Sequence, residues 1–351
     1  MKYKYLKIID SLYQDLNYSN NSLMHGNAGL CFFLYHLARS ANNPEYEELA
    51  DNLLGKTFDN LSTAVLPDFE NGLAGIGWVV EHLVQNGFAE GNTDEILEEV
   101  DNKVFKLLNE TNLTSFELTS GLSGYLFYLI ARLKKPANPK SMAQWINREL
   151  LILVINKLDE IVTTQFPSIT KEMYFDLFWR FPVLFYGLAE AFDLNIYSEK
   201  IRCMVNQWVM SLEAYLPSMH INRLYMATVL TLIKYRVPNK RIEKQIQILL
   251  FATDFDTLKT EVDSQALNIR FGWPGVVWLL YQASRIIPAN YPNYRLIDLT
   301  RKEIIQKYKV SLEKDFTTVE ANSKQFGISE GLAGIGLMEL LWPEILEGNE
   351  N

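Results

Sequence analysis

Several residues with acid–base side chains lie just before short Gly-x-x-Gly motifs in this sequence, which we call glycine phrases. His25 directly precedes Gly26, and Glu70 and Glu330 each stand within two residues of a later glycine phrase. Imidazole and carboxylate groups can accept and return protons, and both can bind a metal ion. Glu117 lies four residues before another phrase. Glu117 and His25 are therefore the candidate catalytic bases.

Arginines and indoles stand near the same helix starts. Guanidinium groups are fixed hydrogen-bond donors, and aromatic rings are platforms, so this set suits a peptide or a sugar. The alternative is that these polar residues cap the helix starts or interact with water at the helix ends, without binding a ligand. A metal site made of His25 with Glu70 and Glu330 is a further hypothesis, but one imidazole does not make a site, and we assign no metal. The candidate substrate-binding residues are Glu70, Asp176, Trp179, Arg180, Arg223, Arg270, Trp273 and Glu330.

The glycine phrases open apolar segments that predict helices. The pattern Gly-x-x-Gly begins at residues 26, 72, 121, 272 and 331, before stretches such as LCFFLYHLA and VVWLLYQAS. Two glycines three residues apart allow helix starts to crowd where a side chain would collide. Degenerate copies anchored on Arg180 and Arg223 lack the glycines but keep the apolar pattern. The starts are 43 to 59 residues apart, which indicates a repeat.

Amphipathic helices are expected between the apolar ones. An apolar helix must be covered on both sides, whereas an amphipathic helix is covered on one. We therefore predict an all-α fold, an α/α toroid (barrel) of seven helix pairs with inner and outer layers, forming a single domain over residues 1–351. All inner helices would start at one mouth of the barrel. The predicted outer helices span residues 3–16, 44–61, 94–108, 139–162, 198–215, 240–252 and 293–309.

Composition excludes some classes of protein and partner. The net charge of −9 and the pI near 5.2 argue against a nucleic-acid partner. No apolar run approaches the roughly 18 residues of a membrane span, and the N-terminus lacks the apolar centre of a signal peptide. We expect a cytoplasmic protein. Cys31 and Cys203 lie in apolar helical patterns and are expected to be buried free thiols.

Four stretches resemble the lanthionine synthetase C-like family: HGNAGLCFFL, ENGLAGIGWVVEHL, FELTSGLSGYLFYLIARL and FGISEGLAGIGLMELL. The resemblance covers nearly the whole chain and implies a barrel of seven helix pairs with glycine-rich inner-helix starts. Members of this family cyclise ribosomally made peptides by adding a cysteine thiol to a dehydrated serine or threonine. The resemblance therefore implies a precursor peptide as substrate, a place in lanthipeptide biosynthesis and a modifying enzyme as a second candidate partner.

Zinc is expected for the family, but its ligands are missing here. In the zinc-dependent members, two cysteines and a histidine before the fifth and sixth inner helices hold the metal, which generates the thiolate. The corresponding residues 220–223 and 270–272 read His-Ile-Asn-Arg and Arg-Phe-Gly. A family aspartate is matched by Glu117, and a family histidine is matched by Trp179, which cannot carry a proton. We therefore assign no cofactor.

Three functions remain open. The first is a thioether-forming peptide cyclase that works without the usual zinc, with Glu117 or His25 as the base. The second is a non-catalytic relative that binds a peptide or a modifying enzyme. The third is carbohydrate processing, because α/α toroids also host enzymes that use paired carboxylates. We expect a role in peptide modification in the broad sense.

Overall fold

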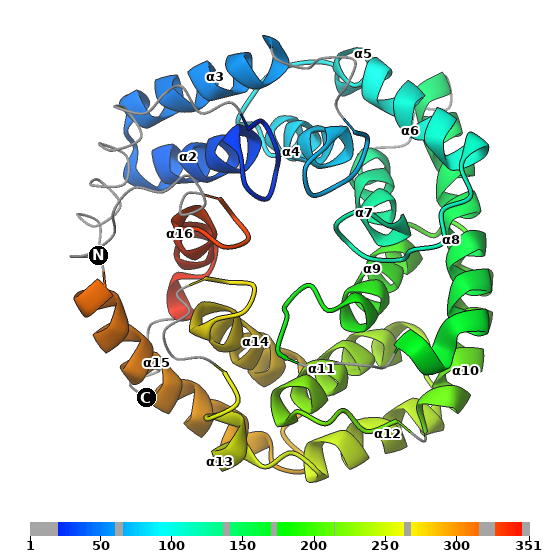
Figure 1. Ribbon diagram of the computed structural model, residues 1–351, viewed down its shortest axis with the longest axis vertical. Coiled ribbons are helices and arrows are strands. Elements are labelled where there is room, and N and C mark those ends of the chain that lie inside the picture. The colour runs from blue at the N-terminus through cyan, green and yellow to red at the C-terminus, as the bar shows by residue number, and fades with distance from the viewer. Residues whose placement is uncertain are drawn as a thin grey trace.

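The helices of this chain form two concentric rings (Figure 1). The computed structural model describes residues 20–59, 66–135, 141–169, 174–213, 215–262, 268–315 and 327–345. Within these ranges the regular structure is helical, and no strand occurs. The inner ring consists of α2 (Asn27–Ala41), α4 (Leu73–Gln85), α7 (Leu122–Leu133), α9 (Arg180–Asp193), α11 (His220–Arg236), α14 (Trp273–Ile286) and α16 (Leu332–Leu341).

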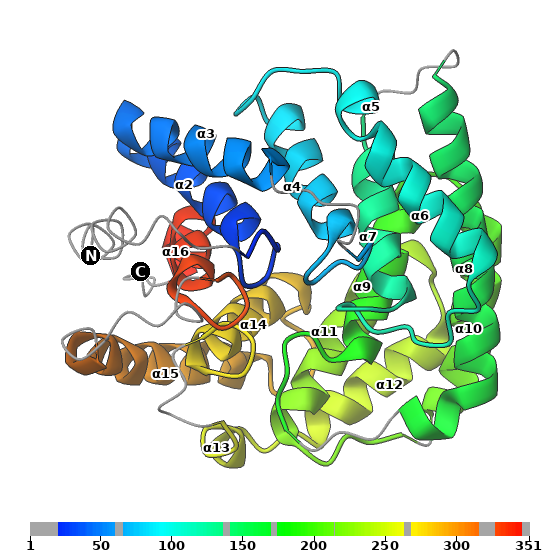
Figure 2. The same cartoon turned by 45° about the horizontal axis from the view of Figure 1, so that its top comes forward.

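The outer ring covers the inner one, as the tilted view in Figure 2 also shows. The all-α toroid predicted from the sequence is confirmed. The predicted helix over residues 3–16 lies outside the described residues. The outer helices are α3 (Pro44–Asp59), α6 (Glu98–Glu110), α8 (Met142–Ile169), α10 (Ser198–Leu212), α12 (Lys240–Phe251) and α15 (Tyr294–Asp315), and the short helices are α5 (Thr93–Ile96), α13 (Phe255–Leu258) and η2 (Pro343–Ile345).

The distribution of apolar residues explains which helix lies in which ring. Every residue from Asn27 to Tyr35 in α2 is buried, because this helix is enclosed by α3, α4 and α16. In α12 the buried residues form one stripe at positions 242, 245, 246, 249 and 250, as expected for an amphipathic helix. Asn239 caps α12 by accepting a hydrogen bond from the backbone N–H of Arg241 (2.7 Å).

The second glycine of each phrase allows close approach between repeats. A Cβ atom on Gly124 would lie 2.5 Å from the Cβ atom of Phe69, which belongs to the loop before α4. A Cβ atom on Gly75 would likewise lie 2.9 Å from the Cβ atom of Leu23 in the loop before α2. Distances this short are not tolerated between carbon atoms. The glycine spacing therefore sets how closely one inner helix start packs on the loop of the preceding repeat.

The loops that precede six of the inner helices are joined by backbone hydrogen bonds. We call these segments the loop ring; they comprise residues 23–26, 69–72, 118–121, 177–179, 269–272 and 328–331, and Figure 1 shows them turned toward the centre. The bonds run from Glu70 N to Thr119 O (3.0 Å), Met24 N to Glu70 O (3.2 Å), Ser329 N to Met24 O (3.1 Å), Arg270 N to Ser329 O (3.3 Å) and Leu177 N to Arg270 O (2.8 Å).

The start of α11 has different partners. The backbone N–H groups of His220 and Ile221 donate to the carboxylate of Glu261, each at 2.9 Å. The guanidinium of Arg223 donates to the carbonyl of Ala252 at 2.5 Å. The loop before α9 hydrogen-bonds directly to the loop before α14. The loop before α11 therefore has no part in this series of backbone hydrogen bonds, although the hydroxyl of Tyr225 in α11 donates to Leu177 O of the loop ring at 2.7 Å.

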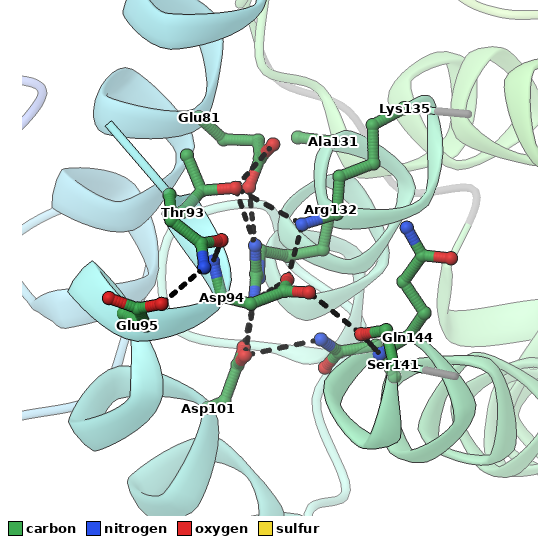
Figure 3. Close-up of polar contacts among 12 residues, drawn as sticks. Glu81, Thr93, Asp94, Glu95, Asp101, Ala131, Arg132, Lys135, Ser141 and Gln144 are labelled. Atoms are coloured by element: carbon green, nitrogen blue, oxygen red, sulfur yellow. Dashed lines mark hydrogen bonds and ion pairs between the residues drawn. The ribbon is translucent and has the colours of Figure 1, made fainter. Parts of the chain in front are cut away.

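A buried ionic network ties α7 to α4, α5 and α6 (Figure 3). The guanidinium of Arg132 has no exposed surface and lies 2.5 Å from Glu81, 2.6 Å from Asp101 and 3.2 Å from Asp94. Burial acts to lower the pKa of Arg132, but the hydrogen bond and charge of Asp101 and the hydrogen bond to Glu81 raise it above its ordinary value. The hydroxyl of Tyr128 donates to Asp101 at 2.6 Å. The network therefore holds the buried arginine charged between the two layers.

The two cysteines differ in their surroundings. Cys31 in α2 is buried, and burial together with Asp51 raises the pKa of its thiol. Cys203 in α10 is exposed, so the expectation of a buried thiol is wrong for this residue, because it lies on the solvent face of an outer helix. Within the described ranges, no helix is both long and apolar enough to cross a membrane.

Candidate functional site

A cluster of charged side chains lies at the loop ring around Arg270. We call His25, Glu70, Asp176, Arg270 and Glu330 the mouth cluster. Nε and Nη2 of Arg270 each lie 3.1 Å from an oxygen of Asp176, which makes a bidentate pair. Nη1 of Arg270 lies 3.8 Å from Oε1 of Glu70 and 4.0 Å from Oε1 of Glu330. One guanidinium thus faces three carboxylates from three different loops.

Local contacts fix the arginine in this position. The Oδ1 atom of Asp176 also accepts a hydrogen bond from the backbone N–H of Phe178 (2.8 Å), so the carboxylate is held by its own loop. The Cζ atom of Arg270 lies 5.2 Å from the ring centroid of Phe178 and 4.7 Å from that of Phe271. Burial acts to lower the pKa of Arg270, but the hydrogen bond and charge of Asp176 raise it. Arg270 is therefore a fixed positive charge.

His25 and Glu70 form an imidazole–carboxylate pair beside this arginine. Nε2 of His25 lies 2.9 Å from Oε1 of Glu70, and their side chains are 23% and 18% exposed. The hydrogen bond from His25 is the main cause that lowers the pKa of Glu70; burial opposes it, and the charges of His25 and Arg270 add to it. Glu70 is therefore ionised at neutral pH and orients the imidazole, as carboxylates do in acid–base sites.

Two predicted residues form a separate and more exposed pair. Oε1 of Glu117 lies 3.8 Å from Nη1 of Arg180, and their side chains are 47% and 40% exposed. The Cζ atom of Arg180 also lies 5.7 Å from the ring centroid of Phe116. A loose pair with this much solvent contributes little fixed geometry. The structure thus brings His25, rather than Glu117, into the mouth cluster.

Three further predicted residues serve other contacts. Trp179 and Trp273 are 7% and 6% exposed, so their indoles do not offer open platforms. Trp179 packs beside the ring of Tyr225, and the ammonium of Lys307 lies 5.6 Å from the ring centroid of Trp273. Arg223 donates to backbone carbonyls near the start of α11. The backbone N–H of Trp179 donates to the carbonyl of Asp176 at 2.8 Å, but among the described residues no side chain of these three forms a hydrogen bond or ion pair with the mouth cluster.

The donor set of the mouth cluster does not fit the zinc site that the family resemblance implies. Cys31 and Cys203 lie inside α2 and α10, away from the loop ring. His25 is the one soft or imidazole donor in the mouth cluster, and its Nε2 is engaged with Glu70. Over the described part of the chain, no group of three His, Cys, Asp or Glu residues is arranged to hold a metal ion. We therefore propose no metal-dependent step.

A cavity of about 480 Å³ lies inside the inner ring. None of the mouth-cluster residues lines it. Apolar side chains of the loop ring line one side of it, and the lining reaches the C-terminal ends of α14 and α16. Its lining residues are Leu23, Met24, Phe32, Phe69, Trp78, Leu118, Phe127, Leu177, Phe178, Val183, Tyr186, Tyr225, Thr228, Val229, Leu232, Ile269, Trp278, Leu279, Gln282, Ile286, Ile328 and Trp342.

Sequence reasoning missed the aromatic rings of this cavity. Five of them stand six residues after the first glycine of a phrase or its anchor, namely Phe32, Trp78, Phe127, Tyr186 and Trp278. This register places one residue of each helix at the same depth in the ring. Aligning the repeats on the glycines and comparing that column would have revealed the layer.

The inner ring also brings together two histidines from neighbouring helices. Nε2 of His36 lies 3.3 Å from Nε2 of His82, on the neighbouring helices α2 and α4. Burial is the main cause that lowers the pKa of each to about 4, and Arg39 adds to it in both. The ring of Phe32 contacts both imidazoles. The pair is therefore uncharged at neutral pH.

Comparison with known proteins agrees with this architecture. Residues 18–176 match the family described as lanthionine synthetase C-like protein. A solved structure described as nisin cyclase matches with a TM-score of 0.69 over 99% of both chains, at 16% sequence identity. At this identity the likeness shows the fold. A comparison with curated proteins gives no match.

Proposed function

Because the chain belongs to the lanthionine synthetase C-like family, we propose that it modifies a ribosomally made peptide, which it binds at the mouth cluster. The peptide's cysteine would be activated by a side chain instead of zinc. The observation that carries this proposal is the 2.9 Å pair of His25 and Glu70 beside the fixed guanidinium of Arg270. A base, an orienting carboxylate and a cation are the groups that a thiol addition requires.

In the proposed reaction the peptide supplies both reacting groups. His25 takes the proton from the cysteine thiol, and Glu70 stabilises the resulting imidazolium. The sulfur bonds to the β-carbon of a dehydrated serine or threonine, and the electron pair of the double bond moves to the α-carbon and the adjoining carbonyl. Nη1 of Arg270 can donate to that carbonyl oxygen, because its nearest carboxylate oxygens lie 3.8 and 4.0 Å away. His25 then returns the proton to the α-carbon, so no atom is gained or lost.

The test uses a peptide that contains cysteine and dehydroalanine. Ring closure leaves the mass unchanged but removes the free thiol, so the product is detected as peptide that resists a thiol-alkylating reagent. We expect His25→Ala to lower the rate by about 100-fold or more, and Glu70→Gln by about tenfold. Glu117→Gln is the matched carboxylate control and should change the rate less than about twofold. A larger loss in Glu117→Gln than in His25→Ala would reverse the assignment of the base.

A non-catalytic role is the second candidate, favoured by the donor set that does not fit zinc. The same peptide distinguishes this role from catalysis. A non-catalytic wild type would bind the peptide but leave its thiol reactive, and Arg270→Ala would bind it more weakly. Absence of both binding and ring closure would contradict both candidates. We do not propose carbohydrate cleavage, because only the analogy with other α/α toroids supports it.

A further inference from the structure

The cavity of the inner ring has no part in the proposed peptide reaction. Its volume of about 480 Å³ lies within the range of small-molecule sites, roughly 300–1,000 Å³. Its lining comes from six inner helices, the loop ring and Trp342 after α16. We propose that this cavity is a second binding site, which takes an uncharged, ring-bearing small molecule with a hydrogen-bonding group.

The charge of the lining selects for a neutral ligand. Among the described residues, every side chain that lines the cavity is uncharged. A carboxylate, phosphate or ammonium group would lose its hydration there and find no ion partner, which makes its transfer from water strongly unfavourable. The mouth cluster, by contrast, presents one guanidinium and three carboxylates. The two sites therefore select for different chemistry.

The aromatic side chains form an arc that suits a flat ring. Phe32 lies 5.5 Å from Trp78 between ring centroids, Phe69 lies 6.3 Å from Trp78, and Phe127 lies 6.0 Å from Tyr186. Phe69 joins the two halves of this arc through Phe127, at 6.4 Å. These separations are those of stacked and edge-to-face pairs, so a ligand ring can extend the arc in the same geometry.

The opposite side of the cavity supplies a second aromatic wall. Trp278 and Trp342 lie 6.0 Å apart between ring centroids, with an angle of 68° between their planes. Aliphatic side chains of α11 lie between the two walls, including Val229 and Leu232. A ring-bearing ligand would therefore contact aromatic faces on two sides and aliphatic groups on a third.

Two polar side chains of the lining, Gln282 and Tyr186, are available to a ligand. Two others are already engaged, because the hydroxyl of Thr228 donates to Leu224 O at 2.8 Å and that of Tyr225 donates to Leu177 O at 2.7 Å. The amide of Gln282 and the hydroxyl of Tyr186 have no hydrogen-bond partner among the described residues. Burial and the charge of Glu190 raise the pKa of Tyr186 to about 12, so its hydroxyl remains a donor. A ligand carbonyl, hydroxyl or amide would complete these bonds.

The probe for this site is N-phenyl-1-naphthylamine, an uncharged aromatic amine whose fluorescence rises in apolar surroundings. Its matched counterpart is 1-anilinonaphthalene-8-sulfonate, which has the same rings and an added sulfonate. We expect saturable binding of the neutral probe and at least about tenfold weaker binding of the sulfonate. Equal binding of the two probes would overturn the proposal, and so would displacement of the neutral probe by tetraethylammonium, which would indicate a cation site.

Two variants locate the bound probe. Val229→Trp fills the cavity and should weaken binding at least tenfold, whereas Phe251→Trp places the same ring on an exposed position (79%) and should leave binding unchanged. Trp278→Leu is the milder change if Val229→Trp does not fold, and it should lower energy transfer from tryptophan to the probe. Unchanged binding in both Val229→Trp and Trp278→Leu would exclude the cavity. Peptide cyclisation is assayed separately, so either proposal can fail alone.

Discussion

The imidazoles of His36 and His82 are held uncharged by their surroundings. Burial lowers the pKa of each to about 4, and the charge of Arg39 acts in the same direction. Arg39 itself is fixed, because its Nη2 donates to the carbonyls of Asn86 and Gly87 at 2.9 and 3.0 Å. Each folded pKa thus lies below the ordinary value of 6.5. Acid must therefore favour the unfolded chain, which takes up these protons more readily.

We predict that this pair makes the protein acid-sensitive. The stability it contributes is fully present above about pH 6.5 and is lost as the pH falls toward about 4. We expect the double variant His36→Gln, His82→Gln to lose about 1–3 kcal/mol less unfolding free energy on acidification than the wild type does. The effect is kept to this size because both rings are partly exposed. The measurement is the urea unfolding free energy at pH 7.5 minus that at pH 4.5, so a pH-independent effect cancels. Equal differences in wild type and variant would contradict the assignment.

Helices of this protein are positioned by glycines at their starts and by one arginine between layers. The sequence predicted the inner helices well, because each phrase supplies its own N-cap glycine; α14, for instance, starts at Trp273, directly after Gly272. It also suggested Glu70 as a neighbour of His25. The placement of Arg223 could not be predicted, because no glycine marks the start of α11 and its partner Ala252 is 29 residues further along the chain.

A glycine at a crowded helix start and a glycine with open space around it should respond oppositely to substitution by alanine. Gly124→Ala would place a Cβ atom 2.5 Å from both Leu118 O and Phe69 Cβ, and we expect a loss of about 1–3 kcal/mol. Gly55 lies on α3, where an added Cβ atom would meet no neighbouring side chain or loop within 4 Å, and Gly55→Ala should stabilise by about 0.5–1 kcal/mol. Thermal or denaturant unfolding gives both values. A similar effect of the two changes would mean that crowding does not explain the phrases.

Removal of the buried arginine should be far more costly than removal of a surface cation. Arg132→Leu leaves Glu81 and Asp101 buried without their partner, and we expect a loss of about 3–5 kcal/mol. The comparison is Lys106→Ala, which breaks an exposed pair with Glu110 at 3.9 Å and should cost less than about 1 kcal/mol. The difference is measured from the denaturant midpoints, provided that the dependence of the unfolding free energy on denaturant is equal in the proteins compared. A small loss of unfolding free energy in Arg132→Leu would mean that water or rearrangement replaces the ion pairs.

The whole molecule depends on a seam between its last and first described inner helices. α16 packs on α2, and Ser329 N donates to Met24 O at 3.1 Å across this seam. The side chain of Phe33 occupies the space beside Gly336, whereas Tyr128 lies beside Gly77 at the equivalent position of the second repeat. Contacts across the seam join residues about 300 apart in the chain, so they carry a larger loop-closure cost than contacts between successive repeats.

We predict that damage at the seam loosens both ends of the described chain. Gly336→Ala should raise amide hydrogen exchange in both α2 and α16, because either helix loses the same neighbour. Gly77→Ala is the matched change inside the ring and should raise exchange in α4 and α7, with α16 unaffected. Mass-spectrometric exchange resolves these helices, and faster exchange confined to α16 in Gly336→Ala would show that α2 does not depend on ring closure.

Adjacent residues of the loop ring serve its opposite sides. Ile269 lines the cavity while Arg270 holds the carboxylates of the mouth, and Phe69 and Glu70 are divided in the same way. Each pair shares a single peptide unit, which is planar and rigid. A backbone shift produced by a molecule in the cavity must therefore move the charges on the far side. The loop ring is therefore a wall that can couple the cavity to the mouth cluster.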